Sequence, residues 1–306
     1  MKKRIKLNIL LERYRDVFRV SLVNVPPIKV PPLQVKMKFD AVPTRCHSRR
    51  YSPDQIIYMK EHFKELIDNG LAFKNTSARS ASPPRIVPKK NGQLRMTVDI
   101  RGPNAMTIPL QWPMPVLEVV FSRLVGKKFF FTLDWFKGFW QLGLHVDSQE
   151  WFTMMGIDYM VTPARVLMGQ CDAVAYCQST AQTVYGERYG DGIEAWLDDT
   201  LGSATEESEL MDLLEYTLKR CLEYGLKLNP SKCDFFDTHV IWCGRAISAD
   251  GVGHDSARVK GMIELEPPTN AQQLQQFVCA LNWMRLSIPE YNKVVSPLTT
   301  LLGEIY

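Results

Sequence analysis

The sequence predicts an α+β fold in which helices cover one face of an antiparallel sheet. Helix-like and strand-like segments are mixed along the 306 residues, without the regular strand–helix alternation of a parallel sheet. Several pairs of strands are joined by short turns, and such hairpins form antiparallel pairs. The 45% hydrophobic and 23% charged residues are ordinary for a globular protein, and no internal repeat occurs.

The first 44 residues predict a basic, proline-rich arm that is extended and packs poorly. A short helix is expected near residues 7–18. Residues 1–50 carry 13 Lys and Arg against 3 Asp and Glu, which fits either a surface that faces a polyanion or a solvated tail. The charge pattern alone leaves both interpretations open. The prolines that interrupt the arm are Pro26, Pro27, Pro31, Pro32 and Pro43.

Further helices follow from capping residues and from apolar side chains at helical spacing. The first begins at Ser52, an N-cap with Pro53 at the first helical position, and ends at Gly70. The last begins at Thr269 with a Thr-x-x-Gln capping pattern, and prolines break up the segment after it. The others run from near Asp172 to Tyr185 and from about Glu206 to Tyr224, and the late prolines are Pro289 and Pro297.

Strands are predicted where short apolar runs are bounded by turn residues. Asn91-Gly92 is the strongest of the turn signals and predicts a hairpin over residues 81–101. The other predictions are a strand at 129–134, a hairpin around Gly156 within 151–164, a tight hairpin over 193–203 and a single short strand at 240–247.

Carboxylates close two of these apolar runs: Asp134 ends one strand, and Asp198 and Asp199 lie in the turn of the 193–203 hairpin. Adjacent residues of a strand point to opposite faces, so Asp198 and Asp199 cannot be equal ligands of one ion. If the strands are neighbours, Asp134 and Asp198 can share cations, with Asp199 as an accessory. Ligation by a few oxygens suits Mg²⁺, and two such ions stabilise phosphoryl transfer. An Asp-Asp pair alone also fits an ordinary solvated turn.

Basic side chains cluster at the tip of the first hairpin and on its outgoing strand. They are Lys89, Lys90 and Arg95. Arginine with its planar fork and lysine as a point charge can hold a triphosphate. A solvated hairpin tip explains the same residues until the tip is placed opposite the acids.

Composition excludes several classes of protein. No run approaches the roughly 18 apolar residues of a membrane helix, so no membrane partner is expected. The basic start lacks the apolar stretch and cleavage site of a signal peptide. Seven cysteines with no Cys-x-x-Cys pair indicate reduced thiols. A soluble intracellular protein is therefore expected.

Six motifs stand in a defined order. They are Pro-Lys-Lys-Asn-Gly to Ile-Arg-Gly-Pro-Asn at 88–104, Thr-Leu-Asp-x-x-x-Gly-Phe-Trp-Gln at 132–141, Met-Gly-x-x-x-Ala-x-Ala-x-x-Gln at 168–178, Trp-Leu-Asp-Asp at 196–199, Gly-Leu-Lys-Leu-Asn-Pro-Ser-Lys-Cys-Asp-Phe-Phe at 225–236 and Trp-Cys-Gly-Arg-Ala-Ile-Ser at 242–248. In this order and spacing the chain resembles the reverse transcriptase of gypsy-type LTR retrotransposons over about residues 45–300.

The resemblance implies a right-hand polymerase with fingers, a palm built on the antiparallel sheet, and the start of a thumb. Fingers and palm would span 45–253, with the fingers at roughly 45–128 and 149–165. Residues 254–306 would form a thumb or connection-like segment that ends before any ribonuclease H.

Site residues carry over by position. Asp134, Asp198 and Asp199 match the catalytic, metal-binding acids. Phe139 matches the aromatic gate that excludes a ribose 2′-hydroxyl, although it also fits plain core. The residues that match dNTP contacts are Lys89, Lys90, Arg95, Phe139, Gly169, Gln178 and Lys232, and those that match the primer grip are Trp242, Cys243 and Gly244.

The implied function is an RNA-directed DNA polymerase that extends a primer on an RNA or DNA template with dNTPs. It would use two Mg²⁺ ions, with Mn²⁺ as a possible substitute. Trp196 replaces the usual tyrosine, and Leu167 and Val174 stand where the family has proline. A catalytically silent remnant that still binds nucleic acid therefore stays an alternative. A metal-binding module without nucleic acid would need the motif order to be accidental. The oligomeric state is not predicted.

Overall fold

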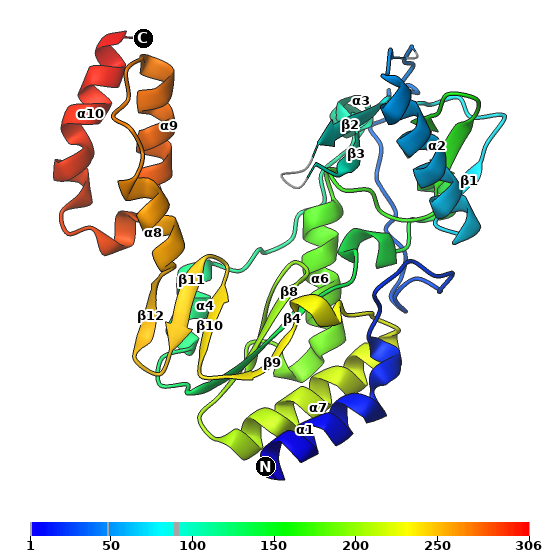
Figure 1. Ribbon diagram of the computed structural model, residues 1–306. Coiled ribbons are helices and arrows are strands. Elements are labelled where there is room, and N and C mark those ends of the chain that lie inside the picture. The colour runs from blue at the N-terminus through cyan, green and yellow to red at the C-terminus, as the bar shows by residue number, and fades with distance from the viewer. Residues whose placement is uncertain (1, 48, 89–91, 306) are drawn as a thin grey trace.

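The computed structural model describes residues 2–47, 49–88 and 92–305, and the chain forms an open U (Figure 1). The base of the U holds the largest sheet and its helices. One arm holds the hairpins and helix that follow the N-terminal segment, and the other arm holds the C-terminal helices. No helix in the described part of the chain is both long and apolar enough to cross a membrane.

The sheet at the base is antiparallel, with strand order β7-β8-β4-β9. Alternate residues of β4 enter two separate cores: Phe131 and Leu133 pack under α6 and α7, whereas Phe130 packs on the other face. The predicted α+β class, the strand at 129–134 and the 193–203 hairpin are confirmed. The helices predicted from near Asp172 to Tyr185 and from about Glu206 to Tyr224 are confirmed as well. The elements are β4 (Phe129–Asp134), β7 (Ile193–Trp196), β8 (Asp199–Ala204), β9 (Asp234–Asp237), α6 (Ala173–Tyr185) and α7 (Glu207–Tyr224).

The N-terminal segment begins with a helix and continues as an extended, mostly exposed stretch, and a few of its apolar side chains are anchored in the main core. Its helix α1 (Lys2–Arg13) lies beside α7 (Figure 1), and Leu10 is buried in the main core. The proline-rich stretch after it is extended, and Ile28 and Leu33 are buried in the main core. Prolines fix an extended backbone at little entropic cost, and its apolar side chains then cover the core.

The first arm of the U contains the predicted helix and hairpins. Helix α2 (Pro53–Asp68) begins with a capping box between Ser52 and Gln55, and Gly70 follows its end at φ +64°. The hairpins predicted over 81–101 and around Gly156 are present. The remaining elements here are β1 (Ala72–Lys74), β2 (Pro84–Pro88), β3 (Leu94–Val98), α3 (Arg101–Met106), α5 (Val146–Gln149), β5 (Met154–Met155) and β6 (Met160–Pro163).

A second hairpin replaces the single strand predicted at 240–247. Cys243 and Gly244 form a two-residue turn with positive φ values of 48° and 75°, which sends the chain back on itself. Trp242 packs edge-on against Phe121, with ring centroids 6.1 Å apart, and so joins this sheet to α4. The elements are β10 (His239–Trp242), β11 (Arg245–Ser248), the unpredicted β12 (Gly251–His254) and α4 (Leu117–Arg123).

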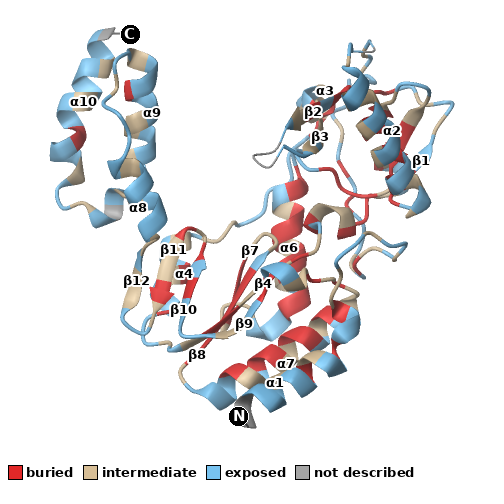
Figure 2. Cartoon of the chain, viewed as in Figure 1, coloured by how far each residue is buried: buried red, intermediate tan, exposed pale blue. Residues whose placement is uncertain are grey.

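The second arm of the U is a small group of helices with few buried side chains (Figure 2). The helix expected at Thr269 forms, but Asn270 is its N-cap and accepts from the Gln273 backbone N–H. Pro297 lies inside a helix rather than ending one. That helix packs against its neighbour, which offsets the hydrogen bond that proline removes. The elements are α8 (Ser256–Ile263), α9 (Ala271–Asn282) and α10 (Tyr291–Ile305).

Candidate active site

The base sheet brings the three predicted acids together. Strands β4 and β8 are antiparallel neighbours, and Asp134 lies directly opposite Asp199 in their register. The turn before β8 places Asp198 beside them, because the Trp135 backbone N–H donates to the Asp198 carbonyl at 3.1 Å. Leu197 takes a positive φ of 59° to make this tight turn. Asp134 and Asp198 therefore lie close together, as expected for neighbouring strands.

The acids repel one another. Burial and the charge of Asp134 raise the pKa of Asp198. Burial, followed by the charges of Asp198 and Asp134, raises the pKa of Asp199 to about 6. Lys232 opposes both shifts, and its Nζ lies 3.0 Å from Asp134 Oδ2. A further cation at this place would relieve the remaining repulsion.

The donor set fits an ion that needs few protein ligands. In the described residues, no group of three or more His, Cys, Asp or Glu side chains forms a complete metal-holding cluster. Asp134 and Asp198, however, line one cavity. Mg²⁺ commonly binds through one or two carboxylates and completes its shell with water and substrate phosphates. Two facing carboxylates beside an open cavity match that requirement.

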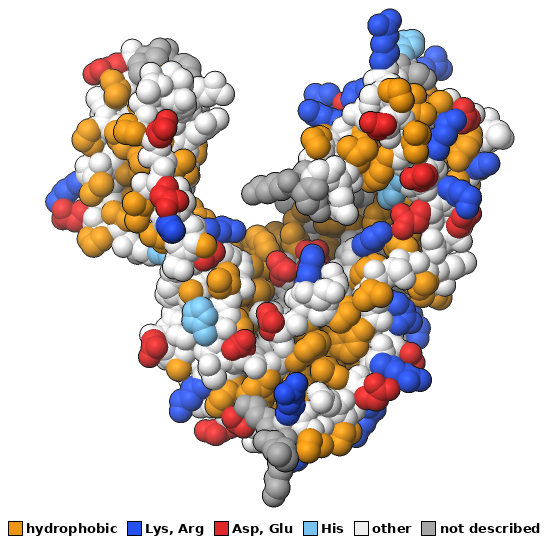
Figure 3. All heavy atoms as spheres, viewed as in Figure 1, with side chains coloured by type: hydrophobic (Ala, Val, Ile, Leu, Met, Phe, Trp, Pro, Cys, Tyr) orange, Lys and Arg blue, Asp and Glu red, His pale blue; other side chains and the backbone are white. Residues whose placement is uncertain are grey.

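The cavity beside the acids has a volume of about 610 Å³. Its lining includes Asp134, Asp198, Arg95, Phe139 and Lys232, which come from widely separated parts of the sequence. Cationic, acidic and aromatic side chains thus line one space that is large enough for a nucleotide-sized ligand. Figure 3 shows the same face hollowed between the two arms, with acidic and basic side chains on its floor.

A glycine brings the aromatic residue to the cavity. Phe139 lies in a short 3-10 helix (Gly138–Gln141), and a Cβ on Gly138 would be 3.0 Å from Asp198 Cβ. The buried Gln141 amide fixes this helix by donating to the carbonyls of Phe136 and Lys227 at 2.7 and 2.8 Å. Gly138 and Gln141 were not predicted as site residues, although both stand in the 132–141 motif.

Arg95 reaches the cavity from β3, and its Nη2 lies 2.6 Å from Met168 Sδ. Lys89 and Lys90, predicted beside it, lie outside the described residues. Gly169 has a φ of +94° and its carbonyl accepts from Asn104 Nδ2 at 2.8 Å, so the glycine shapes the loop whose Met168 lines the cavity.

Gln178 lies behind the cavity rather than in its wall. It is fully buried on α6, and its Oε1 accepts from the Leu197 backbone N–H at 3.0 Å. Its Nε2 donates to the Ala195 carbonyl at 3.0 Å and to the Tyr189 hydroxyl at 3.1 Å. Both ends of the amide therefore hold the hairpin that carries Asp198.

Residues 87–247, more than half of the chain, match the family described as Reverse transcriptase (RNA-dependent DNA polymerase). The chain belongs to the reverse transcriptase family. Its gypsy-type resemblance is supported by relatives that are retrotransposon polyproteins. Members of the family generally use divalent metal ions.

Two curated relatives cover almost all of this reverse transcriptase chain. It is 27% identical over 310 residues to the retrovirus-related Pol polyprotein from transposon opus of Drosophila melanogaster, covering 95% of this chain and 30% of that protein. It is 24% identical over 297 residues to the Transposon Tf2-3 polyprotein of Schizosaccharomyces pombe (strain 972 / ATCC 24843), covering 95% and 22%. The chain thus spans less than a third of the length of these relatives.

Solved structures share the right-hand fold. A foamy viral protease-reverse transcriptase in complex with double-stranded DNA has a TM-score of 0.90 at 22% identity, covering 99% of this chain and 53% of that chain. The enzyme in complex with an RNA/DNA hybrid has a TM-score of 0.87 at 21% identity, covering 99% and 40%. The predicted polymerase fold is confirmed.

The predicted primer-grip residues of this reverse transcriptase divide into core and turn. Trp242 is only 4% exposed and packs in the core between α4 and the hairpin. Cys243 and Gly244 form the tip, where a Cβ on Gly244 would lie 2.6 Å from Arg258 Nη1 of the C-terminal arm. Trp196, the replacement for tyrosine, packs against this same core.

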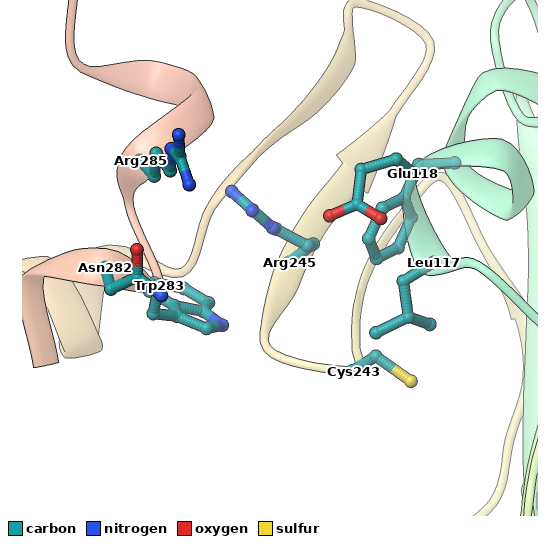
Figure 4. A pocket seen from close by; sticks show the side chains of 8 residues that line it. Leu117, Glu118, Cys243, Arg245, Asn282, Trp283 and Arg285 are labelled. Carbon is teal, nitrogen blue, oxygen red and sulfur yellow. The ribbon is translucent and has the colours of Figure 1, made fainter. Parts of the chain in front are cut away.

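The hairpin tip also borders a second cavity of about 540 Å³ between the base and the C-terminal arm. Figure 4 shows Arg245 extending between Glu118 and Trp283 in this space, with Cys243 below it. The Arg245 guanidinium lies 4.8 Å from the Trp283 ring centroid and 5.9 Å from that of Phe121. The arginine therefore joins the two parts of the hand through cation–π contacts.

Proposed function

We propose that this chain is an RNA-directed DNA polymerase domain that extends a primer with dNTPs. The observation that supports this most is the single cavity lined by Asp134, Asp198, Arg95 and Phe139. Acids for metal ions, a cation for a triphosphate and an aromatic ring for a sugar are the groups that nucleotide transfer needs. We further propose that residues 45–253 act as fingers and palm and residues 254–306 as the thumb.

A primed RNA or DNA template is the proposed partner. The foamy viral enzymes of the same fold were solved with double-stranded DNA and with an RNA/DNA hybrid. Residues 1–50 of this chain carry 13 basic against 3 acidic residues, which favours contact with a polyanion. Binding should therefore weaken steeply as salt rises.

In this proposal Asp134 and Asp198 hold Mg²⁺, with Asp199 as an accessory acid. When bound, the two ions supply Lewis-acid stabilisation of the attacking 3′-hydroxyl and the leaving pyrophosphate. Arg95 binds the triphosphate through its planar fork. Lys232 adds a point charge beside Asp134. Mn²⁺ should substitute for Mg²⁺.

The remaining site residues act on geometry and selectivity. Phe139 packs under the sugar and excludes a 2′-hydroxyl. Gly169 and Gln178 keep their neighbours in place, the first at the loop of Met168 and the second at the Asp198 turn. Trp242, Cys243 and Gly244 support the primer end as one hairpin.

The test is primer extension on an RNA template with Mg²⁺ and dNTPs, comparing wild type with Asp198→Asn. Asp212→Asn is the control, because that acid is exposed on α7, away from the cavity. We expect Asp198→Asn to lose activity by about a hundredfold or more, and Asp212→Asn to match wild type. Undiminished extension by Asp198→Asn would overturn the metal assignment. No extension by wild type, with salt-sensitive duplex binding retained, would favour the catalytically silent alternative.

A further inference from the structure

The residues that follow the two facing acids meet beneath the sheet. Asp134 and Asp199 lie on one face of neighbouring strands, and strand alternation directs the next residues, Trp135 and Thr200, to the opposite face. Both are buried in the core that α6 covers. A displacement of either side chain would therefore also move the acid that precedes it in the chain.

Tyr185, at the end of α6, joins Trp135 to Thr200. Its hydroxyl oxygen lies 3.0 Å from Trp135 Nε1 and 2.6 Å from Thr200 Oγ1. An indole N–H can only donate, so the phenol oxygen accepts from Trp135 and exchanges its second hydrogen bond with the threonine hydroxyl. One phenol thus ties together the undersides of β4 and β8.

The strands need such a tie at this point because their ladder ends there. The pairing of β4 with β8 runs from Phe129 opposite Ala204 to Asp134 opposite Asp199, and Asp134 is the last residue of β4. Strand ends are where local opening costs least. Beyond the ladder, the backbone bond from the Trp135 N–H to the Asp198 carbonyl and the side-chain bonds of Tyr185 connect the two strands.

Helix α6 holds the same hairpin at a second place. Gln178 lies seven residues before Tyr185, which is two helical turns away and on the same side of the helix. It bonds the turn at Leu197 while Tyr185 bonds the strand at Thr200. The helix therefore fixes both the turn that carries Asp198 and the strand that carries Asp199.

We propose that Tyr185 is a positioning residue that sets the placement of Asp134 and Asp199 for divalent metal binding, an inference that rests on the proposed function. Phenylalanine would fill the same space in the core, so the positioning depends on the tyrosine hydroxyl rather than on its ring. Burial raises the pKa of this phenol well above its usual value, which keeps its proton in place. Removing the hydroxyl leaves the Trp135 indole and the Thr200 hydroxyl without this buried partner.

The experiment compares Tyr185→Phe with Tyr176→Phe. Tyr176 lies on the same helix, is also buried, and donates its hydroxyl to the Pro31 carbonyl of the N-terminal segment at 2.7 Å. Both variants lose one bonded hydroxyl, but only one of them loses a link to the acids. The readouts are Mn²⁺ titration of the protein alone by electron paramagnetic resonance, and single-nucleotide incorporation resolved into kcat and the dNTP KM.

We expect Tyr185→Phe to weaken Mn²⁺ binding and to lower kcat, each by about tenfold, with little change in KM. Tyr176→Phe should stay within about twofold of wild type, well below the tenfold loss of such an outer contact. Equal Mn²⁺ affinity and equal kcat in Tyr185→Phe and Tyr176→Phe would overturn the inference. If wild type extends no primer, the proposed function fails, and the Mn²⁺ titration still decides this inference by the same comparison.

A second pair of variants keeps the test decisive if Tyr185→Phe does not fold. Thr200→Ser retains the hydroxyl and should bind Mn²⁺ as wild type does. Thr200→Val has nearly the same shape without the hydroxyl and should show the tenfold loss expected of Tyr185→Phe. A serine variant as impaired as the valine variant would assign the effect to packing and overturn the inference.

Discussion

Lys232 and Asp134 form an ion pair, with Nζ 3.0 Å from Oδ2, on the wall of the proposed nucleotide cavity. The pair is built by the backbone: the Asn229 N–H donates to the Asp134 carbonyl at 2.9 Å, and a 3-10 turn (Pro230–Lys232) then brings the lysine over the acid. The lysine opposes, without cancelling, the rise in the pKa of both Asp198 and Asp199. In the free protein it partly neutralises the acids.

The pH dependence of stability should report this charge balance. Without divalent ions, Asp199 has a pKa of about 6 in the folded chain, against an ordinary value of 3.8. Between these values the folded chain keeps a proton that the unfolded chain has released, so this acid makes stability fall as pH rises through the window. Asp199→Asn should flatten that fall, and Lys232→Met should steepen it.

The measurement is thermal unfolding in a chelator between pH 4 and 7. Lys219→Met, a change at an exposed lysine on α7, is the control and should follow wild type. A slope in Asp199→Asn equal to that of wild type would contradict the assignment.

Gly138 should not tolerate a side chain. An alanine Cβ there would lie 3.0 Å from Asp198 Cβ and 3.2 Å from its Oδ2, so either the acid or the loop of Phe139 must move. We expect Gly138→Ala to lower primer extension by at least about tenfold, since small displacements of reacting groups are costly. Gly261→Ala in α8 has open space around its Cβ and should keep full activity while gaining about 0.5–1 kcal/mol in stability. Equal activity of the two variants would refute the close contact.

Gln170 should be replaceable by an apolar residue at a gain in stability. It is 3% exposed, and within the described residues neither its Oε1 nor its Nε2 has a hydrogen-bond partner. Gln170→Leu removes two unsatisfied buried atoms and should raise the free energy of unfolding by about 1 kcal/mol or more. Gln178→Leu, at an equally buried but fully bonded glutamine, should lower it instead. Denaturant unfolding checks both, and a loss of stability in Gln170→Leu would show that its amide has a partner.

Phe139 should control the choice of sugar. Its ring lines the same cavity as Asp198, and in the proposed function it packs under the sugar. We expect Phe139→Ala to relax discrimination against ribonucleotides by about tenfold or more, with a smaller effect on dNTP use. The ratio of kcat/KM for dNTP and NTP measures this. An unchanged ratio would remove the gate role and leave Phe139 as core.

Local signals in the sequence predicted the palm well. The strand at 129–134 and the hairpin over 193–203 are short apolar runs with clear ends. The sequence predicted that Asp198 lies near Asp134 only if the two strands are neighbours, and the pairing of β4 with β8 meets that condition. The helix after Ser52 was readable because its capping box and Gly70 are local features. Interactions between neighbours in the chain are visible in the sequence.

Features that depend on tertiary contacts could not be predicted from local sequence patterns. Cys243 adopts a left-handed φ that favours glycine, so the local pattern predicts a continuous strand at 240–247, and only the resemblance implies the hairpin that forms there. Pro297 sits inside α10 because packing of that helix outweighs the local break. The role of Gln178 depends on the Leu197 N–H and the Ala195 carbonyl, which only the folded chain brings to it.

Incorporation of dTTP on a poly(rA)/oligo(dT) template measures whether Asp134 takes part in metal-dependent DNA synthesis. Asp237→Asn is the control, because that exposed acid lies on β9 of the same sheet but does not line the cavity. We expect wild type and Asp237→Asn to incorporate dTTP at the same rate, and Asp134→Asn to be slower by about a hundredfold or more. Incorporation by Asp134→Asn at the wild-type rate would contradict this role of Asp134.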